Sequence, residues 1–189
     1  MDAVLLSRIQ FGLAAGFHFI FPPLTLGLTL IIVIFETMFY RTEEVIYKSI
    51  SSFFIKILAL IFALGVATGI VLEFSFGTNW AEYSRVVGDI FGAPLAAEGI
   101  FAFFLESVFL GVILFGRNKV SRGFYLFATI MVFAGAHLSA LWILIANSWM
   151  QTPAGFVMEG GRAVMSDFFA AVFNPSTLNG GVGSSVIVS

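Results

Sequence analysis

Four long runs of apolar residues, separated by short polar segments, dominate the hydropathy pattern of this chain. They cover about residues 11–39, 52–73, 94–116 and 123–147. A helix needs roughly 20 residues to cross the ~30 Å hydrocarbon layer of a bilayer, and each run reaches that length. Because backbone polar groups in lipid must be paired within their own segment, the pattern predicts four membrane-spanning helices and an all-α fold.

The composition is that of a chain solvated by lipid. Of its 189 residues, 59% are hydrophobic and 11% are charged, 24 are phenylalanine, and the mean hydropathy is +1.02. We therefore expect a polytopic membrane protein with a four-helix transmembrane bundle. The formal net charge of −2 and the lack of a basic run argue against a nucleic-acid partner. Because cysteine is absent, disulfides, iron–sulfur clusters and thiolate metal sites are excluded.

Basic residues in the connections predict the orientation. They concentrate between the first and second runs and between the third and fourth, at Arg41, Lys48, Lys56, Arg117, Lys119 and Arg122. The positive-inside rule places these two connections in the cytoplasm and both chain ends outside. The opening residues, MDAVLLSRIQ, lack a basic segment followed by a cleavage site, so we expect the first helix to be retained.

We single out three ionisable side chains inside apolar runs: His18 in the first, and Glu98 and Glu106 in the third. A charge at the bilayer centre costs roughly 3 to more than 10 kcal/mol, so these residues indicate a functional site. Pro22 and Pro23 follow His18 closely. Because proline lacks a backbone donor and crowds the carbonyl four residues back, we expect a kink beside His18.

The spacing of Glu98 and Glu106 predicts that they share one broad face. Eight helical residues place them about 80° apart around the axis and about 12 Å apart along it. Such a pair suits metal ligation followed by proton delivery, or a proton relay alone. The spacing fits equally well two protonated acids that form hydrogen bonds to neighbouring helices and have no catalytic role. His18 could likewise form only a hydrogen bond to a neighbouring helix.

Four segments in order resemble the first four transmembrane helices of subunit I of cytochrome bd-type quinol oxidases. They are LSRIQFGLAAGFHFIFPPLTLG, ALGVATGIVLEFSFGTNW, VGDIFGAPLAAEGIFAFFLES and LSALWILIANSWMQTP. The resemblance covers about residues 5–153 and implies the first half of that fold. It implies a prokaryotic quinol:oxygen oxidoreductase of the cytoplasmic membrane that reduces O2 to water with three haems. It leaves open whether the high-spin pair contains haem d or only haem b.

The resemblance also implies roles for individual residues. His18, in HFIFPPLTLG, corresponds to an axial ligand of a high-spin haem iron. Glu98, in GAPLAAEG, corresponds to an iron ligand or to the last step of proton delivery. Glu106, in FFLES, belongs to the proton path from the cytoplasm, with Ser139 beside it. Arg8 is expected to contact a haem propionate.

Other polar residues near helix ends stand in segments that match the family. Asn147 is expected in the haem-propionate network or in a structural role, and Glu73 and Asp89 likewise. Residues 1–153 are thus expected to form the haem-binding unit, with 154–189 as an outward-facing C-terminal segment.

The chain departs from the family pattern after residues 174–175. The low-spin haem ligands, a histidine and a methionine, and the loop ascribed to quinol binding have no counterpart here. We therefore expect this chain to be inactive alone and completed by a second polypeptide, by subunit II, or by both, with quinol bound elsewhere in the complex. A split large subunit is favoured over a truncated or diverged one. The final residues, VGSSVIVS, are too short to span a membrane.

His137 is a second departure, because the family usually has asparagine before LSALW. A polar contact between helices is the favoured interpretation, and an added haem contact or proton-path residue is the alternative. Two other functions stay open. A low-spin electron-transfer cytochrome would pair His18 with His137, and a proton-linked transporter subunit would contain no haem.

Overall fold

The computed structural model describes residues 2–178, apart from the side chains of residues 93–97. Its helices and strands are α1 (Ala3–His18), α2 (Phe21–Thr42), α3 (Val45–Thr78), α4 (Ala81–Ala97), the π-helix η1 (Glu98–Phe103), α5 (Phe104–Phe115), α6 (Arg122–Gln151), β1 (Phe156–Glu159), β2 (Arg162–Met165), α7 (Phe168–Val172) and α8 (Pro175–Leu178). The final segment VGSSVIVS, expected to be a short tail, lies outside the described residues.

Four helical stretches of the described chain are long and apolar enough to cross a membrane. They are Ala3–Thr42, Val45–Thr78, Glu98–Phe115 and Arg122–Gln151. The expected four-helix transmembrane bundle is therefore confirmed. The described residues also contain one small two-stranded antiparallel sheet, β1–β2, which the hydropathy pattern did not predict.

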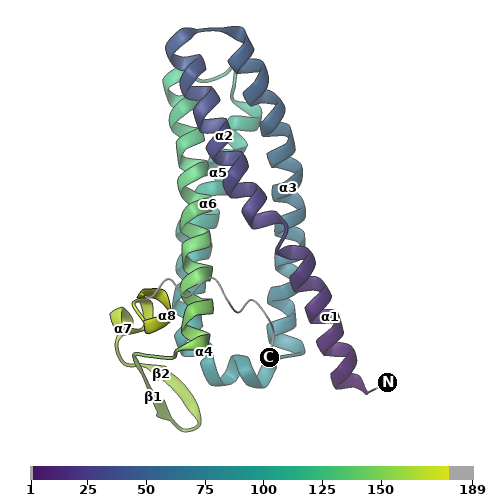
Figure 1. The fold of residues 1–189 in the computed structure, drawn as a ribbon, viewed down its shortest axis with the longest axis vertical. Helices are drawn as coiled ribbons and strands as arrows, with labels where there is room; N and C mark the ends of the chain where they lie inside the picture. Colours follow the sequence, from purple (N-terminus) through teal and green to yellow (C-terminus); the bar gives the residue numbers. More distant parts are fainter. Residues whose placement is uncertain (1, 179–189) are drawn as a thin grey trace.

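The bundle consists of two helical hairpins. In Figure 1, α2 and α3 form one hairpin and α5 and α6 the other, and their connecting turns lie at the same end of the bundle. Between the hairpins lies an apolar core of Ile32, Ile55, Leu58, Leu110, Ile113, Tyr125, Ala128 and Val132. Because these side chains come from all four helices, their burial fixes how the two hairpins face each other.

The kink expected beside His18 is confirmed. α1 ends at His18 and α2 begins at Phe21, with proline in its first turn. A proline at the start of a helix loses nothing there, because the first backbone N–H groups have no helical partner. α1 therefore leaves the axis of α2 and reaches the far end of the bundle, where the chain's N-terminus lies (Figure 1).

The third apolar run is interrupted by a π-helical turn that the hydropathy pattern did not predict. α4 ends at Ala97, and six residues of π-helix precede α5. π-Helical turns are rare and often occur at functional sites. This turn begins at Glu98, so the expected ideal-helix geometry between Glu98 and Glu106 does not apply.

The last described segment covers the end of the bundle farthest from the hairpin turns. The β1–β2 hairpin packs on α4, and Arg162 forms an ion pair of 2.9 Å with Asp89. Asn174 is fully buried, and its side-chain oxygen accepts a hydrogen bond of 2.7 Å from Ser148 on α6. These contacts attach the segment to α4 and α6.

Candidate functional site

His18 is held at the kink by a hydroxyl group of α3. Its Nδ1 lies 2.8 Å from Oγ1 of Thr68, and this hydroxyl donates its own proton to the carbonyl of Leu64 at 2.8 Å. When the single proton of the Thr68 hydroxyl goes to this carbonyl, its oxygen accepts from His18, and Nδ1 carries the ring proton. The lone pair of Nε2 is then free for a ligand, as in metal-binding histidines whose other nitrogen is hydrogen-bonded.

Small residues on α3 allow the kinked segment to come close. A Cβ atom added to Gly69 would lie 3.3 Å from Cε1 of His18, and one added to Gly65 would lie 3.4 Å from Cβ of Phe21. Glycines four residues apart form a flat strip on which another membrane helix can pack closely. Gly69 and Thr68 therefore contact His18 directly, and Gly65 allows the neighbouring Phe21 to pack on α3.

Glu98 stands at the first position of the π-helix and contacts α6. The hydroxyl of Ser139 donates a hydrogen bond of 2.6 Å to Oε1 of Glu98. The resemblance placed Ser139 beside Glu106, whereas here its hydrogen bond goes to Glu98. Ser139 lies one turn of α6 beyond Gly135, which packs against Glu106, so Ser139 reaches Glu98 instead.

Glu106 is buried on α5, with 5% of its surface exposed. Its Oε1 has no hydrogen-bond partner among the described residues. A Cβ atom at Gly135 of α6 would lie 3.0 Å from Cβ of Glu106 and 3.1 Å from its backbone nitrogen. Gly135 and Ser139 are one helical turn apart, so one face of α6 contacts both glutamates.

The other residues singled out in the sequence lie apart from these contacts. Arg8 is exposed on α1, and Asn147 is half-buried on α6. His137 is exposed, and its Nδ1 donates to the carbonyl of Phe133 at 2.8 Å. The centroids of the His137 and Phe133 rings are 4.0 Å apart. No hydrogen bond in residues 2–178 joins His18 to either glutamate, so the histidine and the carboxylates occupy different helix pairs.

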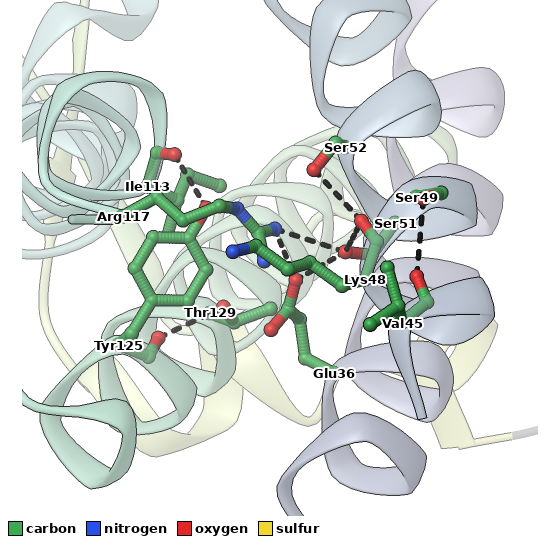
Figure 2. A network of polar contacts seen from close by, with 10 residues as sticks. All are labelled: Glu36, Val45, Lys48, Ser49, Ser51, Ser52, Ile113, Arg117, Tyr125 and Thr129. Atoms are coloured by element: carbon green, nitrogen blue, oxygen red, sulfur yellow. Dashed lines mark hydrogen bonds and ion pairs between the residues drawn. The ribbon is translucent and has the colours of Figure 1, made fainter. Parts of the chain in front are cut away.

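The sequence analysis missed a second buried polar cluster, at the end with the hairpin turns. Figure 2 shows that Glu36, which is 3% exposed, accepts hydrogen bonds from Arg117 and Ser51. The guanidinium of Arg117 lies 4.4 Å from the ring of Tyr125, whose hydroxyl donates to the carbonyl of Ile113 at 2.5 Å. The signal was available, since Glu36 is a charged residue inside the first apolar run.

A family model described as cytochrome bd terminal oxidase subunit I matches residues 6–182. The chain is 51% identical over 176 residues to cytochrome bd-II ubiquinol oxidase subunit 1 of Escherichia coli (strain K12), covering 92% of this chain and 34% of that protein. It is 43% identical over 175 residues to cytochrome bd ubiquinol oxidase subunit 1 of Bacillus subtilis (strain 168), covering 93% and 37%.

A solved structure shows the same arrangement of helices. The bd oxidase from Geobacillus thermodenitrificans matches with a TM-score of 0.85 and 31% identity, over 94% of this chain and 41% of that one. The chain therefore spans about a third to two fifths of the length of the proteins it matches.

Proposed function

Because this chain belongs to the cytochrome bd terminal oxidase subunit I family, we propose that it forms the high-spin haem-binding and proton-delivering part of a quinol oxidase. The relatives above are described as ubiquinol oxidase subunits. Their described activity extends to this chain as part of a complex that reduces O2 to water. This chain spans a third to two fifths of the relatives' length. We propose that it acts only together with the rest of the oxidase.

The geometry of His18 carries this proposal. An imidazole whose Nδ1 is occupied by Thr68 presents Nε2 as a ligand, which suits the iron of a haem. The described residues contain no group of three or more histidines and acids, but a haem takes only one or two axial ligands from protein. A haem bound at His18 supplies the iron at which oxygen is reduced, and the chain supplies the ligand and its orientation.

Glu98 and Glu106 are proposed to hold and transfer protons for this reaction. Oε1 of Glu98 accepts from Ser139 at 2.6 Å, which orients the carboxylate and leaves its second oxygen for an iron or a proton. The unpartnered Oε1 of Glu106 can bind a proton and release it to a neighbour. Close packing against Gly135 keeps bulk water from this position.

The remaining functions belong to parts of the oxidase outside these residues. We propose that quinol and the low-spin haem are bound by the rest of subunit I, and that subunit II completes the complex. We propose that the cofactors are haem b together with haem d or a second haem b. Arg8 and Asn147 are proposed to contact the haem propionates. The chain is a multi-pass membrane protein. We propose that its N-terminus faces outward, because the basic connections gather at the opposite end.

The decisive experiment replaces His18 in the assembled oxidase and measures carbon monoxide binding. We expect His18→Ala to abolish the carbon monoxide-induced shift of the reduced high-spin spectrum, because the axial ligand is lost. His137→Ala is the matched control, since His137 is exposed and its hydrogen bond within residues 2–178 goes to the carbonyl of Phe133. A normal shift in His18→Ala, or its loss in the control, contradicts the assignment.

Two outcomes of the same experiment test the other functions. Purified wild-type complex without a Soret band would support a transporter subunit. A reduced spectrum that carbon monoxide leaves unchanged would support a low-spin cytochrome ligated by His18 and His137. The hydrogen bonds that direct His18 to α3 and His137 to its own helix favour the oxidase assignment over that pairing.

A further inference from the structure

The end of the bundle with the hairpin turns contains a cavity that the proposed oxidase chemistry does not use. It has a volume of about 210 Å³ and lies beside the polar cluster of Figure 2. Polar and charged groups of four segments line it, namely Glu36, Tyr40, Lys48, Arg117, Asn118, Arg122 and Tyr125. The cavity therefore offers hydrogen-bond donors from α2, α3, the α5–α6 connection and α6.

The charges around this cavity do not cancel. Its one carboxylate, Glu36, is already neutralised by Arg117, which uses only Nη2 for its bonds to Glu36 and Ser51. The Nε and Nη1 groups of Arg117 have no partner within residues 2–178. The Arg117 side chain is 17% exposed, so a ligand in the cavity can reach these donors.

Lys48 adds a second available cation. Its ammonium lies 5.9 Å from the centre of the Phe39 ring, and no described carboxylate is within ion-pair distance of it. Arg122 pairs with Glu43 at 2.8 Å, but both side chains are more than half exposed and the pair is weakened by solvent. The cavity is thus cationic and lacks a matching anion.

Its position indicates the class of anion. Its lining residues lie near the turns of the two helical hairpins (Figure 1), which is the level of the lipid headgroups for helices that span the bilayer. Basic pockets between membrane helices at this level bind phosphate headgroups of anionic lipids. Exposed Phe124 and Phe127, which are 44% and 45% accessible, follow Arg122 on α6 and provide an apolar surface for acyl chains.

We propose that this cavity binds a phosphate group through Lys48 and Arg117, with the buried Glu36 and Tyr125 fixing the guanidinium in place. Arg117 stacks on Tyr125 and bonds Glu36, so its remaining N–H groups point in a fixed plane that a phosphate can accept in pairs. The phosphate is that of an anionic phospholipid or free inorganic phosphate, and these two sources can be separated by experiment.

The test uses the assembled oxidase in maltoside micelles, which contain no phosphate. Phosphatidylglycerol, a glucosyl-diacylglycerol with the same acyl chains, or inorganic phosphate is added, and binding is measured by native mass spectrometry and by the shift in Tm. Lys48→Gln is compared with Lys119→Gln, which makes the same charge change at an exposed position outside the cavity. Lys48→Arg retains the charge.

We expect Lys48→Gln to weaken phosphate or phosphatidylglycerol binding about fivefold, and Lys48→Arg and Lys119→Gln to leave it unchanged. Binding of phosphatidylglycerol alone identifies a lipid site, and binding of inorganic phosphate identifies a site for the free anion. Equal binding of the glucosyl lipid, or equal losses in Lys48→Gln and Lys119→Gln, overturns the proposal. So does the absence of binding by both phosphate sources.

Discussion

Single hydroxyl groups set the chemistry of the two principal side chains. Thr68 bonds Nδ1 of His18 and leaves Nε2 for a ligand, and Ser139 orients the carboxylate of Glu98. Each hydroxyl comes from a helix distant in sequence from the residue it contacts, by 50 and 41 positions. Each hydroxyl bonds one polar atom of its partner. Nε2 of His18 and the second carboxylate oxygen of Glu98 remain for a ligand.

Removing the Thr68 hydroxyl should disturb His18 without changing the size of the side chain. Thr68→Val leaves the Nδ1–H of His18 without its acceptor, at a cost of about 1–3 kcal/mol when buried. We expect a lower haem-to-protein ratio and an altered high-spin spectrum in the assembled oxidase, measured after pigment extraction. Thr68→Ser keeps the hydroxyl and should retain both, and equal loss in the two variants would show that the hydroxyl has no part in orienting His18.

At the scale of helices, glycine positions control how closely neighbours approach. α6 approaches α5 at Gly135, where any side chain would meet Glu106. α3 approaches the kinked segment at Gly65 and Gly69. The four spans and the proline kink follow from local sequence and could be predicted. The π-helix at Glu98 could not, because its i→i+5 hydrogen bonding leaves no signal in the hydropathy pattern.

Gly135→Ala should therefore separate α5 from α6. The added methyl group would lie 3.0 Å from Cβ of Glu106 and 3.1 Å from the carbonyl oxygen of Ala102, which are both fixed by helical backbone. We expect a loss of about 1–3 kcal/mol in the free energy of unfolding, measured by thermal or chemical denaturation in detergent. Gly111→Ala on α5 meets nothing within 4 Å and should be neutral or stabilising. A neutral Gly135→Ala would mean that the helices can move apart freely.

At the scale of the whole molecule, one buried ion pair joins the two hairpins. Glu36 belongs to α2, Ser51 to α3 and Arg117 to the connection after α5 (Figure 2). The apolar core lies between the same hairpins, so polar and apolar contacts specify the same arrangement. The membrane-facing surfaces of these helices stay apolar, as expected of a protein solvated by lipid.

Breaking this pair should destabilise the bundle far more than breaking an exposed one. Arg117→Gln leaves the carboxylate of Glu36 buried without a cation, which costs about 3–5 kcal/mol. Arg122→Gln removes the exposed pair with Glu43 and should cost about 0–1 kcal/mol. The difference is measured by unfolding in detergent, and adding Glu36→Gln to Arg117→Gln should recover part of the loss. Equal effects of the two single substitutions would exclude a special role for the buried pair.

The sequence alone was sufficient for the membrane setting, the four spans, the kink before Pro22 and the family, because hydropathy, proline chemistry and motif order are local properties. It also marked His18, Glu98 and Glu106 as costly groups in lipid. Only the tertiary structure decided that Thr68 holds His18, that Ser139 bonds Glu98, and that Glu36 pairs with Arg117. These pairings depend on the rotation and depth of whole helices, which arise when distant segments pack together.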